Sequence, residues 1–259
     1  MILALDIGNT NIEIGCMDDD KVLFKDRVST DIRKSKLEYV APLKMLFDMN
    51  HIQTKEVEGA ILSSVVPLLT HNMKEAIRMV FGVNPIVVGA GIKTGLNIQI
   101  DNPATLGADL VVDSVAALNE YGSPVIVIDM GTATTITVID KNKNYIGGAI
   151  LPGVQVSLES LVSETSLLPR ISFNAPSKVI GTNTMVCMQS GIIYGQASQV
   201  DGMIDRFEEE LGYSCNLVAT GGLSSVIIPK CRHDIVLDSE LMLKGLRIIY
   251  NKNNGRTVK

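Results

Sequence analysis

Hydrophobic and polar positions change their spacing several times along the chain, and each change predicts a new element. Apolar residues dominate 3–7 and 12–17, and a polar patch beginning at Gly8 separates them, which predicts two strands joined by a tight turn. A third strand is predicted at 22–28, after an aspartate-rich turn at 18–20. The chain should therefore open with three antiparallel strands.

The spacing then becomes helical. Apolar residues recur every three or four positions at 37–49 and again at 68–81, and a mostly apolar run at 57–66 predicts a buried strand between these two helices. A short strand is predicted at 85–88. Alternation of strands and helices is typical of a central sheet with helices packed on its faces, so we predict an α/β fold.

The second half repeats this order. Strands are predicted at 125–129, 135–140 and 145–151, helices at 154–162, 184–211 and 240–250, and short strands at 217–219 and 235–237. Residues 251–259 are polar and without apolar spacing, which predicts a frayed tail.

The two predicted hairpins also resemble each other in sequence. LALDIGNTNIEIG at 3–15 and VIVIDMGTATTITVID at 125–140 each place an Asp-x-Gly turn between two apolar strands, with Asp6 and Asp129 at matching positions. Hydroxyl or amide side chains follow the glycine in both copies. One supersecondary unit is therefore expected to occur twice, in two domains.

The hairpin tips have the chemistry that a polyphosphate needs. Glycine lets backbone N–H groups approach phosphate oxygens, and neighbouring hydroxyls or amides can donate further hydrogen bonds. An aspartate at the strand end can hold a cation, or its waters, against a phosphate. Two such tips would bind a nucleotide between two domains. The alternative is that each Asp-x-Gly is only a turn signal.

Charge and composition narrow the class of partner. The formal net charge is −5 and no predicted helix gathers Lys and Arg on one face, so neither nucleic acid nor a membrane is expected as a partner. The four cysteines lack C-x-x-C spacing and the three histidines are scattered, which indicates neither a zinc site nor a disulfide framework. The chain opens on a strand, without a cleavable leader or a run of about 18 apolar residues, so a cytoplasmic protein is expected.

A long segment at 89–107 lacks periodicity and carries several glycines and a proline. Loops this long in a compact domain are usually functional or disordered. The segment leads into a helix predicted to begin near Asp109. One interpretation of Asp109 is an ordinary first-turn acid that interacts with the helix dipole.

At this point the chain resembles a known family. Paired Asp-x-Gly hairpins, with a Gly-Gly at 221–222, resemble the sugar-kinase, actin and heat-shock ATPase superfamily. Within it, the ordered motifs resemble type III pantothenate kinase: DIGNTN at 6–11, GAD at 107–109, DMGTATT at 129–135, GGAILPG at 147–153 and ATGGL at 219–223. The resemblance implies two actin-like (ribonuclease-H-like) α/β domains, 1–115 and 116–259, with a duplicated βββαβαβα core and a nucleotide cleft between them.

The resemblance also implies a reaction and a set of site residues. The family phosphorylates pantothenate to 4'-phosphopantothenate with ATP, in the first step of coenzyme A biosynthesis. Asp109 would be the catalytic base, Asp6 would hold Mg²⁺ through water, and Asp129 would bind a monovalent cation, K⁺ or NH₄⁺. ATP would be bound by Asp6, Ile7, Gly8, Asn9, Thr10, Asn11, Gly131, Thr132, Gly221 and Gly222. Pantothenate would be bound by Ile100, Gly107, Ala108, Asp109, Leu110 and Thr184, in a site shared across a homodimer.

Three positions depart from the family pattern. Ile100 stands where the family usually has Tyr, Leu110 where it usually has Arg, and Glu13 where some relatives carry a basic residue. Aliphatic side chains cannot hydrogen-bond the polar end of pantothenate, and one lost charge-assisted hydrogen bond typically costs about 1.5–3 kcal/mol. Three functions stay open: a pantothenate kinase, a kinase of another small alcohol, and a non-catalytic nucleotide-binding regulator on the same scaffold.

Dimerisation has its own basis in the sequence. The predicted helix at 184–211 carries the apolar residues Ile192, Ile193, Val200, Met203 and Ile204 and the small residues Gly191, Gly195, Ala197 and Gly202. Together they form more apolar and small-residue surface than one face of a sheet is expected to cover. The alternative is a helix that lies wholly in the core of its own domain.

Overall fold

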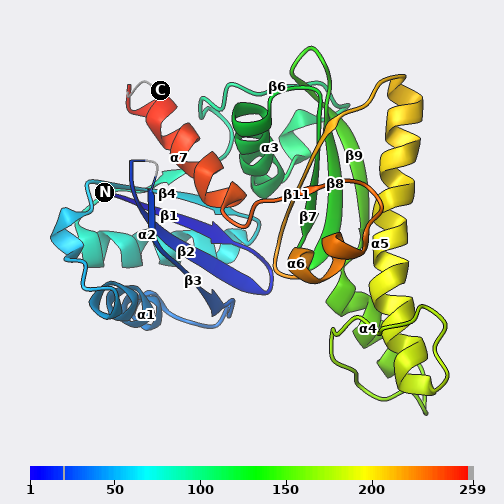
Figure 1. The fold of residues 1–259 in the computed structure, drawn as a ribbon. Coiled ribbons are helices and arrows are strands. Elements are labelled where there is room, and N and C mark those ends of the chain that lie inside the picture. The colour runs from blue at the N-terminus through cyan, green and yellow to red at the C-terminus, as the bar shows by residue number, and fades with distance from the viewer. Residues whose placement is uncertain (20, 256–259) are drawn as a thin grey trace. The chain divides into compact units, whose positions relative to one another are not determined.

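The computed structural model describes residues 1–19 and 21–255, and the chain divides into two compact units (Figure 1). Unit 1 contains residues 1–96 and 102–116, and unit 2 contains Asn97–Asp101 and Ala117–Glu240. Helix α3 (Ala108–Tyr121) passes from one unit to the other after Ala116, next to the expected boundary. Helix α7 (Leu241–Asn253) was expected in the second domain, but the structure groups it with unit 1.

Unit 1 is built on a five-stranded sheet in the order β3-β2-β1-β4-β5. Its strands are β1 (Ile2–Ile7), β2 (Asn11–Asp18), β3 (Lys21–Ser29), β4 (Gly59–Ser64) and β5 (Ile86–Val87). The first three form the predicted antiparallel meander, and β4 and β5 continue the sheet in parallel beyond β1. The helices that follow β3 and β4 are α1 (Lys36–Met49) and α2 (Pro67–Phe81), with a short 3₁₀ turn, η1 (Thr54–Glu56), between α1 and β4.

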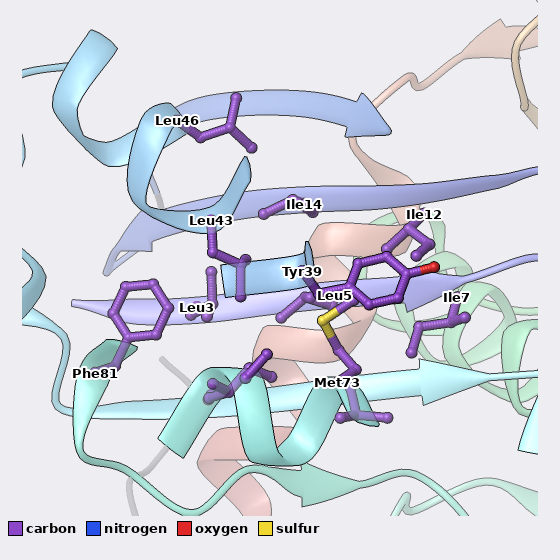
Figure 2. Packing of buried hydrophobic residues seen from close by; sticks show 14 of the residues in the cluster. Leu3, Leu5, Ile7, Ile12, Ile14, Tyr39, Leu43, Leu46, Met73 and Phe81 are labelled. Atoms are coloured by element: carbon purple, nitrogen blue, oxygen red, sulfur yellow. The ribbon is translucent and has the colours of Figure 1, made fainter. Parts of the chain in front are cut away.

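Alternation along β1 decides which helices its side chains meet. Leu3, Leu5 and Ile7 are fully buried in a cluster with residues of α1 and α2 (Figure 2). The residues between them point to the opposite face, where the side chains of α7 lie directly over Gly15 and Gly59. Both glycines let α7 approach the sheet closely, because a Cβ there would overlap Leu243 or Tyr250. Asp6 ends β1 on this second face.

Unit 2 repeats the topology of unit 1. Its sheet has the order β11-β10-β7-β8-β9-β6, with an antiparallel meander followed by parallel strands beyond β7. The strands are β7 (Val125–Met130), β8 (Ala133–Ile139), β9 (Asn144–Pro152), β10 (Asn216–Thr220) and β11 (Val236–Leu237). The internal repeat in the sequence is therefore a repeat of strand order, as predicted.

One strand of unit 2 was not predicted. β6 (Asn97–Ile98) pairs in parallel with β9 and lies within the segment expected to be a loop, which also contains the 3₁₀ turn η2 (Pro103–Thr105). The remaining elements of this unit are the helices α4 (Val154–Ser163), α5 (Thr184–Leu211) and α6 (Ser224–Ile227) and the 3₁₀ turn η3 (Ile228–Lys230). β6 was missed because it lies in a segment without apolar spacing, where periodicity gives no signal for a strand.

The long helix α5 has the predicted bounds but not the predicted exposure. Ile192, Ile193, Val200 and Ile204 are at most 7% exposed and pack in the core of unit 2. The dimerisation argument that counted these residues is therefore wrong, because α5 buries them within its own unit.

The C-terminal tail begins later than predicted. Helix α7 continues to Asn253, so the first three residues of the expected tail, 251–253, are helical. Residues 256–259 of that tail lie outside the described residues. Within the part of the chain that the structure describes, no helix combines the length and the hydropathy needed to cross a bilayer.

Candidate active site

The first hairpin tip follows β1. The Gly8 N–H donates to the Asn11 carbonyl at 3.0 Å, and Asn9, Thr10 and Asn11 are exposed. Ile7 lies in the core and can offer a ligand only its backbone. The predicted tip therefore presents amide and hydroxyl side chains around a glycine, which is the arrangement that phosphate oxygens require.

Thr30 supports this tip and was missed by the sequence analysis. Its hydroxyl donates to the Gly8 carbonyl at 2.7 Å, and its N–H donates to the Thr10 carbonyl at 2.9 Å. Because Thr30 binds carbonyls on both sides of the turn, it fixes the tip from a neighbouring segment. The one available signal was a threonine two residues after the strand predicted at 22–28.

Asp6 lies below the tip on the face covered by α7. Its register partners are Glu13 in β2 and Ser63 in β4, so the three side chains share one face of the sheet. The Glu13 Oε1 atom lies 3.0 Å from the Lys25 Nζ atom. Carboxylate and hydroxyl oxygens are the ligands that Mg²⁺ prefers, so these residues fit the predicted divalent cation.

The second tip brings together two segments that are distant in the sequence. Gly131 and Thr132 are exposed after β7, and Gly221 adopts a φ of +94° at which a Cβ would lie 2.6 Å from the Asp129 Oδ1 atom. The Gly221 backbone therefore lies directly against the Asp129 carboxylate, with Gly222 exposed beside it. The structure brings these predicted ATP-binding and cation-binding residues together.

Gly153 supports the second tip. It is the N-cap of α4, and a Cβ there would come within 2.7 Å of the Gly131 carbonyl oxygen. Only glycine allows the helix to begin this close to the turn. The motif at 147–153 carries part of the resemblance to the family, but the sequence alone predicts no role for Gly153.

The surroundings of Asp129 fit a monovalent cation. Its register partners are Thr135 in β8 and Thr220 in β10, so one carboxylate stands between two hydroxyl side chains. Oxygen atoms with a single negative charge suit K⁺. Among the described residues, no three His, Cys, Asp or Glu side chains form a group that could hold a metal ion.

The acceptor segment is divided between the units. Gly107, Ala108, Asp109 and Leu110 belong to unit 1, whereas Ile100 belongs to unit 2, where it follows β6 and lies beside Gly147. The Gln99 N–H donates to the Tyr145 carbonyl at 2.8 Å and so attaches the segment to β9.

Asp109 lies in the first turn of α3 and is half-buried. Its Oδ1 atom accepts the Leu110 N–H at 2.8 Å, as a first-turn acid can. Its Oδ2 atom makes no hydrogen bond within the described part of the chain. The side chain can therefore stabilise the helix start with one oxygen and accept a proton with the other.

Thr184 is the first residue of α5 and is exposed. The Asn183 side chain caps this helix by accepting the Val186 N–H at 3.0 Å, which orders the turn that carries Thr184. A cavity of about 560 Å³ lies elsewhere in unit 2, between α4 and residues 170–173, and contains none of the predicted site residues.

Comparison with known proteins gives both family and fold. The family model described as type III pantothenate kinase matches residues 2–206. The chain is 44% identical over 253 residues to a type III pantothenate kinase from Halalkalibacterium halodurans, covering 98% of this chain and 100% of the relative. It is 40% identical over 260 residues to one from Agathobacter rectalis, covering 100% of both.

Solved structures show the fold. A conserved putative Baf family transcriptional activator from Campylobacter jejuni has a TM-score of 0.62 at 19% identity, covering 98% of this chain and 99% of that chain. The activator of the 2-hydroxyisocaproyl-CoA dehydratase from Clostridium difficile, with bound ADPNP, has a TM-score of 0.56 at 12% identity, covering 100% and 99%. The predicted α/β fold of the actin-like class is confirmed.

The cysteines offer a test of the Thr184 region. Cys187 is exposed and lies three residues after Thr184. Burial raises the pKa of Cys16 and Cys215 to about 11 and that of Cys231 to about 12. Because the thiolate is the reactive form, we expect Cys187 to account for the fast phase of labelling by a disulfide reagent at about pH 8.

If Thr184 contacts pantothenate, saturating pantothenate should slow this fast phase severalfold, because the ligand would cover the first turn of α5. Cys187→Ser should remove the phase, which identifies the labelled thiol. Labelling that is indifferent to pantothenate would argue against Thr184 as a substrate contact.

Proposed function

The chain belongs to the type III pantothenate kinase family, and on that premise we propose that it transfers the γ-phosphoryl group of ATP to the primary hydroxyl of pantothenate. The product is 4'-phosphopantothenate, a precursor of coenzyme A. The observation that carries the proposal is the 40–45% identity to relatives of this name over 98% or more of the chain. The two folded hairpin tips support it.

To catalyse phosphoryl transfer, a protein mainly has to position the acceptor hydroxyl and offset charge on the phosphate oxygens. Backbone N–H groups and side chains of Asn9 to Asn11, Gly131 and Thr132 contribute the phosphate contacts. Mg²⁺, when bound, would offset charge on the phosphates, and Asp6 would hold it through water. Gly221 and Gly222 bind the rest of the nucleotide, and the Asp109 Oδ2 atom accepts the proton of the attacking hydroxyl.

The acceptor is tested by a coupled ATP-consumption assay with pantothenate and a panel of other small alcohols. Ile100 and Leu110 stand where most of the family has polar side chains. Comparing turnover with pantothenate and with the other alcohols therefore also tests whether the acceptor selectivity of this chain differs from that of the family. Phosphorylation of pantothenate above all other alcohols is the expected result. Turnover with another alcohol but not with pantothenate would contradict the proposal.

Asp109→Asn separates a catalytic base from a structural acid. Asparagine keeps an oxygen that can accept the Leu110 N–H, but it is not a base. Loss of a positioned base typically lowers the rate by about 10²–10⁴-fold, so kcat should fall by that factor while the KM for ATP changes little. The thermal midpoint should stay nearly constant, because asparagine also suits a helix start. Near-normal turnover would exclude the base assignment.

We assign a K⁺ or NH₄⁺ requirement to Asp129. A carboxylate beside phosphate-binding backbone repels ATP, and a monovalent cation held by Asp129 and the neighbouring hydroxyls relieves this repulsion. At fixed Mg²⁺, kcat/KM for ATP should be severalfold higher in K⁺ than in Na⁺, and Asp129→Asn should abolish the difference. Equal activity of the unmodified protein in K⁺ and in Na⁺ would contradict the assignment of a monovalent-cation site to Asp129.

We propose a homodimer surface that keeps the glycines of α5 suggested by the sequence but leaves out its buried residues, Ile192, Ile193, Val200 and Ile204. Val179, Ile180 and Met185 are 61%, 83% and 51% exposed and lie next to Thr184. Along the outer face of α5, the first half carries Gly191 and Gly195, where a Cβ would meet nothing within 4 Å, whereas the second half is charged. An exposed apolar and small-residue surface beside a substrate contact favours a second copy as its partner.

Gly191→Trp tests this dimer. The open space at Gly191 accommodates the indole within one copy, but the indole would block a second copy that packs on α5. Sedimentation should show a dimer for the unmodified protein and mostly monomer for Gly191→Trp, with a raised KM for pantothenate. Glu209→Trp, about five turns further along the same face of α5, is the matched control and should remain dimeric. An unmodified protein that is monomeric at micromolar concentration would exclude the shared site.

A further inference from the structure

The short segment between β3 and α1 supports the first hairpin tip. Thr30, which directly follows β3, donates its hydroxyl to the Gly8 carbonyl at 2.7 Å and its N–H to the Thr10 carbonyl at 2.9 Å. A trans peptide unit holds its carbonyl and its N–H on opposite sides. The N–H groups of Asn9 and Asn11, which share peptide planes with these two carbonyls, therefore point away from Thr30.

The direction of these two N–H groups matters for the proposed function, which assigns them to the phosphates of ATP. Successive backbone N–H groups bind an anion when their conformation lets them converge on it. A shift of Thr30 would move both carbonyls and therefore both N–H groups. Because Thr30 is itself only half-buried, its position depends on how the next residue is held.

That next residue is Asp31, and both its backbone and its side chain have partners. The Tyr39 hydroxyl donates to the Asp31 carbonyl at 2.9 Å and accepts the Asp31 N–H at 3.3 Å. The Asp31 carboxylate accepts from the N–H and the guanidinium of Arg33 at 3.0–3.2 Å. Arg33 is exposed, so Tyr39 supplies the buried part of this support.

Tyr39 joins the core of unit 1 to this segment. It lies in α1, is 1% exposed and belongs to the apolar cluster around β1. Its hydroxyl points toward the end of the cluster that holds Ile7 and Ile12, the last register pair before the turn (Figure 2). A phenylalanine would fill the same apolar space, so what the hydroxyl adds is its contacts with Asp31.

We propose that Tyr39 is a positioning residue for the nucleotide. Through Asp31 and Thr30, its buried hydroxyl fixes the N–H groups of Asn9 and Asn11 in the directions that the phosphates of ATP require. The proposal rests on the proposed ATP-dependent function. Because Tyr39 acts only on the tip that binds phosphate, the affinity for pantothenate should not depend on it.

The test is a calorimetric titration of the full-length protein with ATP in the presence of Mg²⁺ and the absence of pantothenate. Tyr39→Phe should weaken ATP binding by about 2–10-fold, the factor that corresponds to one lost hydrogen bond. In the kinase assay the KM for ATP should rise by a similar factor, while the KM for pantothenate stays unchanged. A hydroxyl that only stabilised the fold would not change the KM for one substrate alone.

Thr30→Val tests the route from Tyr39 to the tip. Valine keeps the N–H of residue 30 but removes the hydroxyl that binds the Gly8 carbonyl. If Tyr39 acts through Thr30, the double variant should lose less ATP affinity than the product of the two separate factors. Separate factors that multiply fully in the double variant, or an unchanged ATP affinity in Tyr39→Phe, would overturn the positioning role.

Tyr121→Phe is the matched control. The Tyr121 hydroxyl also makes a partly buried hydrogen bond, which it donates to the Asp238 carboxylate at 2.8 Å, but both residues belong to unit 2. The thermal midpoint should fall in both tyrosine variants, whereas the ATP affinity should be unchanged in Tyr121→Phe. An equal loss of ATP affinity in the two variants would indicate general destabilisation and would overturn the positioning role.

The binding result is independent of the acceptor assay. An active pantothenate kinase whose Tyr39→Phe variant binds ATP normally would refute the positioning role alone. A protein that phosphorylates no alcohol, but whose ATP affinity falls in Tyr39→Phe, would refute the proposed function alone. Absence of ATP binding by the unmodified protein would refute both.

Discussion

Each unit depends on a central strand that pairs with an antiparallel neighbour on one side and a parallel neighbour on the other. β1 lies between β2 and β4, and β7 lies between β8 and β10. The antiparallel neighbour returns through a tight turn, while the parallel neighbour ends at the same edge of the sheet. Polar side chains from three strands therefore meet where the central strand ends, and the rest of the strand can be apolar on both faces.

Burial of the central strand stabilises the polar turn that follows it. Leu3, Leu5 and Ile7 are fully buried on one face of β1, and α7 packs over Gly15 and Gly59 on the other. This apolar packing offsets the cost of holding carboxylates at a half-buried edge. The tips themselves are held by single contacts from other segments, such as the hydroxyl of Thr30 in unit 1 and the backbone at Gly153 in unit 2.

The two copies differ mainly in the strands beside the central one. Both central strands have an aspartate as their second-last residue and lead into a glycine turn. The positions beside this aspartate carry Glu13 and Ser63 in unit 1 and Thr135 and Thr220 in unit 2. Backbone pairing requires no particular side chain at these positions, so they can change without disturbing the sheet. Charge at each site can therefore diverge while the topology is kept.

The sequence by itself determined the local elements and their order. The spacing predicted the meander of unit 1, the bounds of α5 at 184–211 and, through the repeated hairpin, the matching strand order of unit 2. Only the tertiary structure decided that α7 packs in unit 1, that β6 pairs with β9, and that Ile192 and Ile193 lie in the core of their own unit. Spacing shows which face of an element is apolar, whereas the element that covers this face is chosen by packing between segments far apart in the chain.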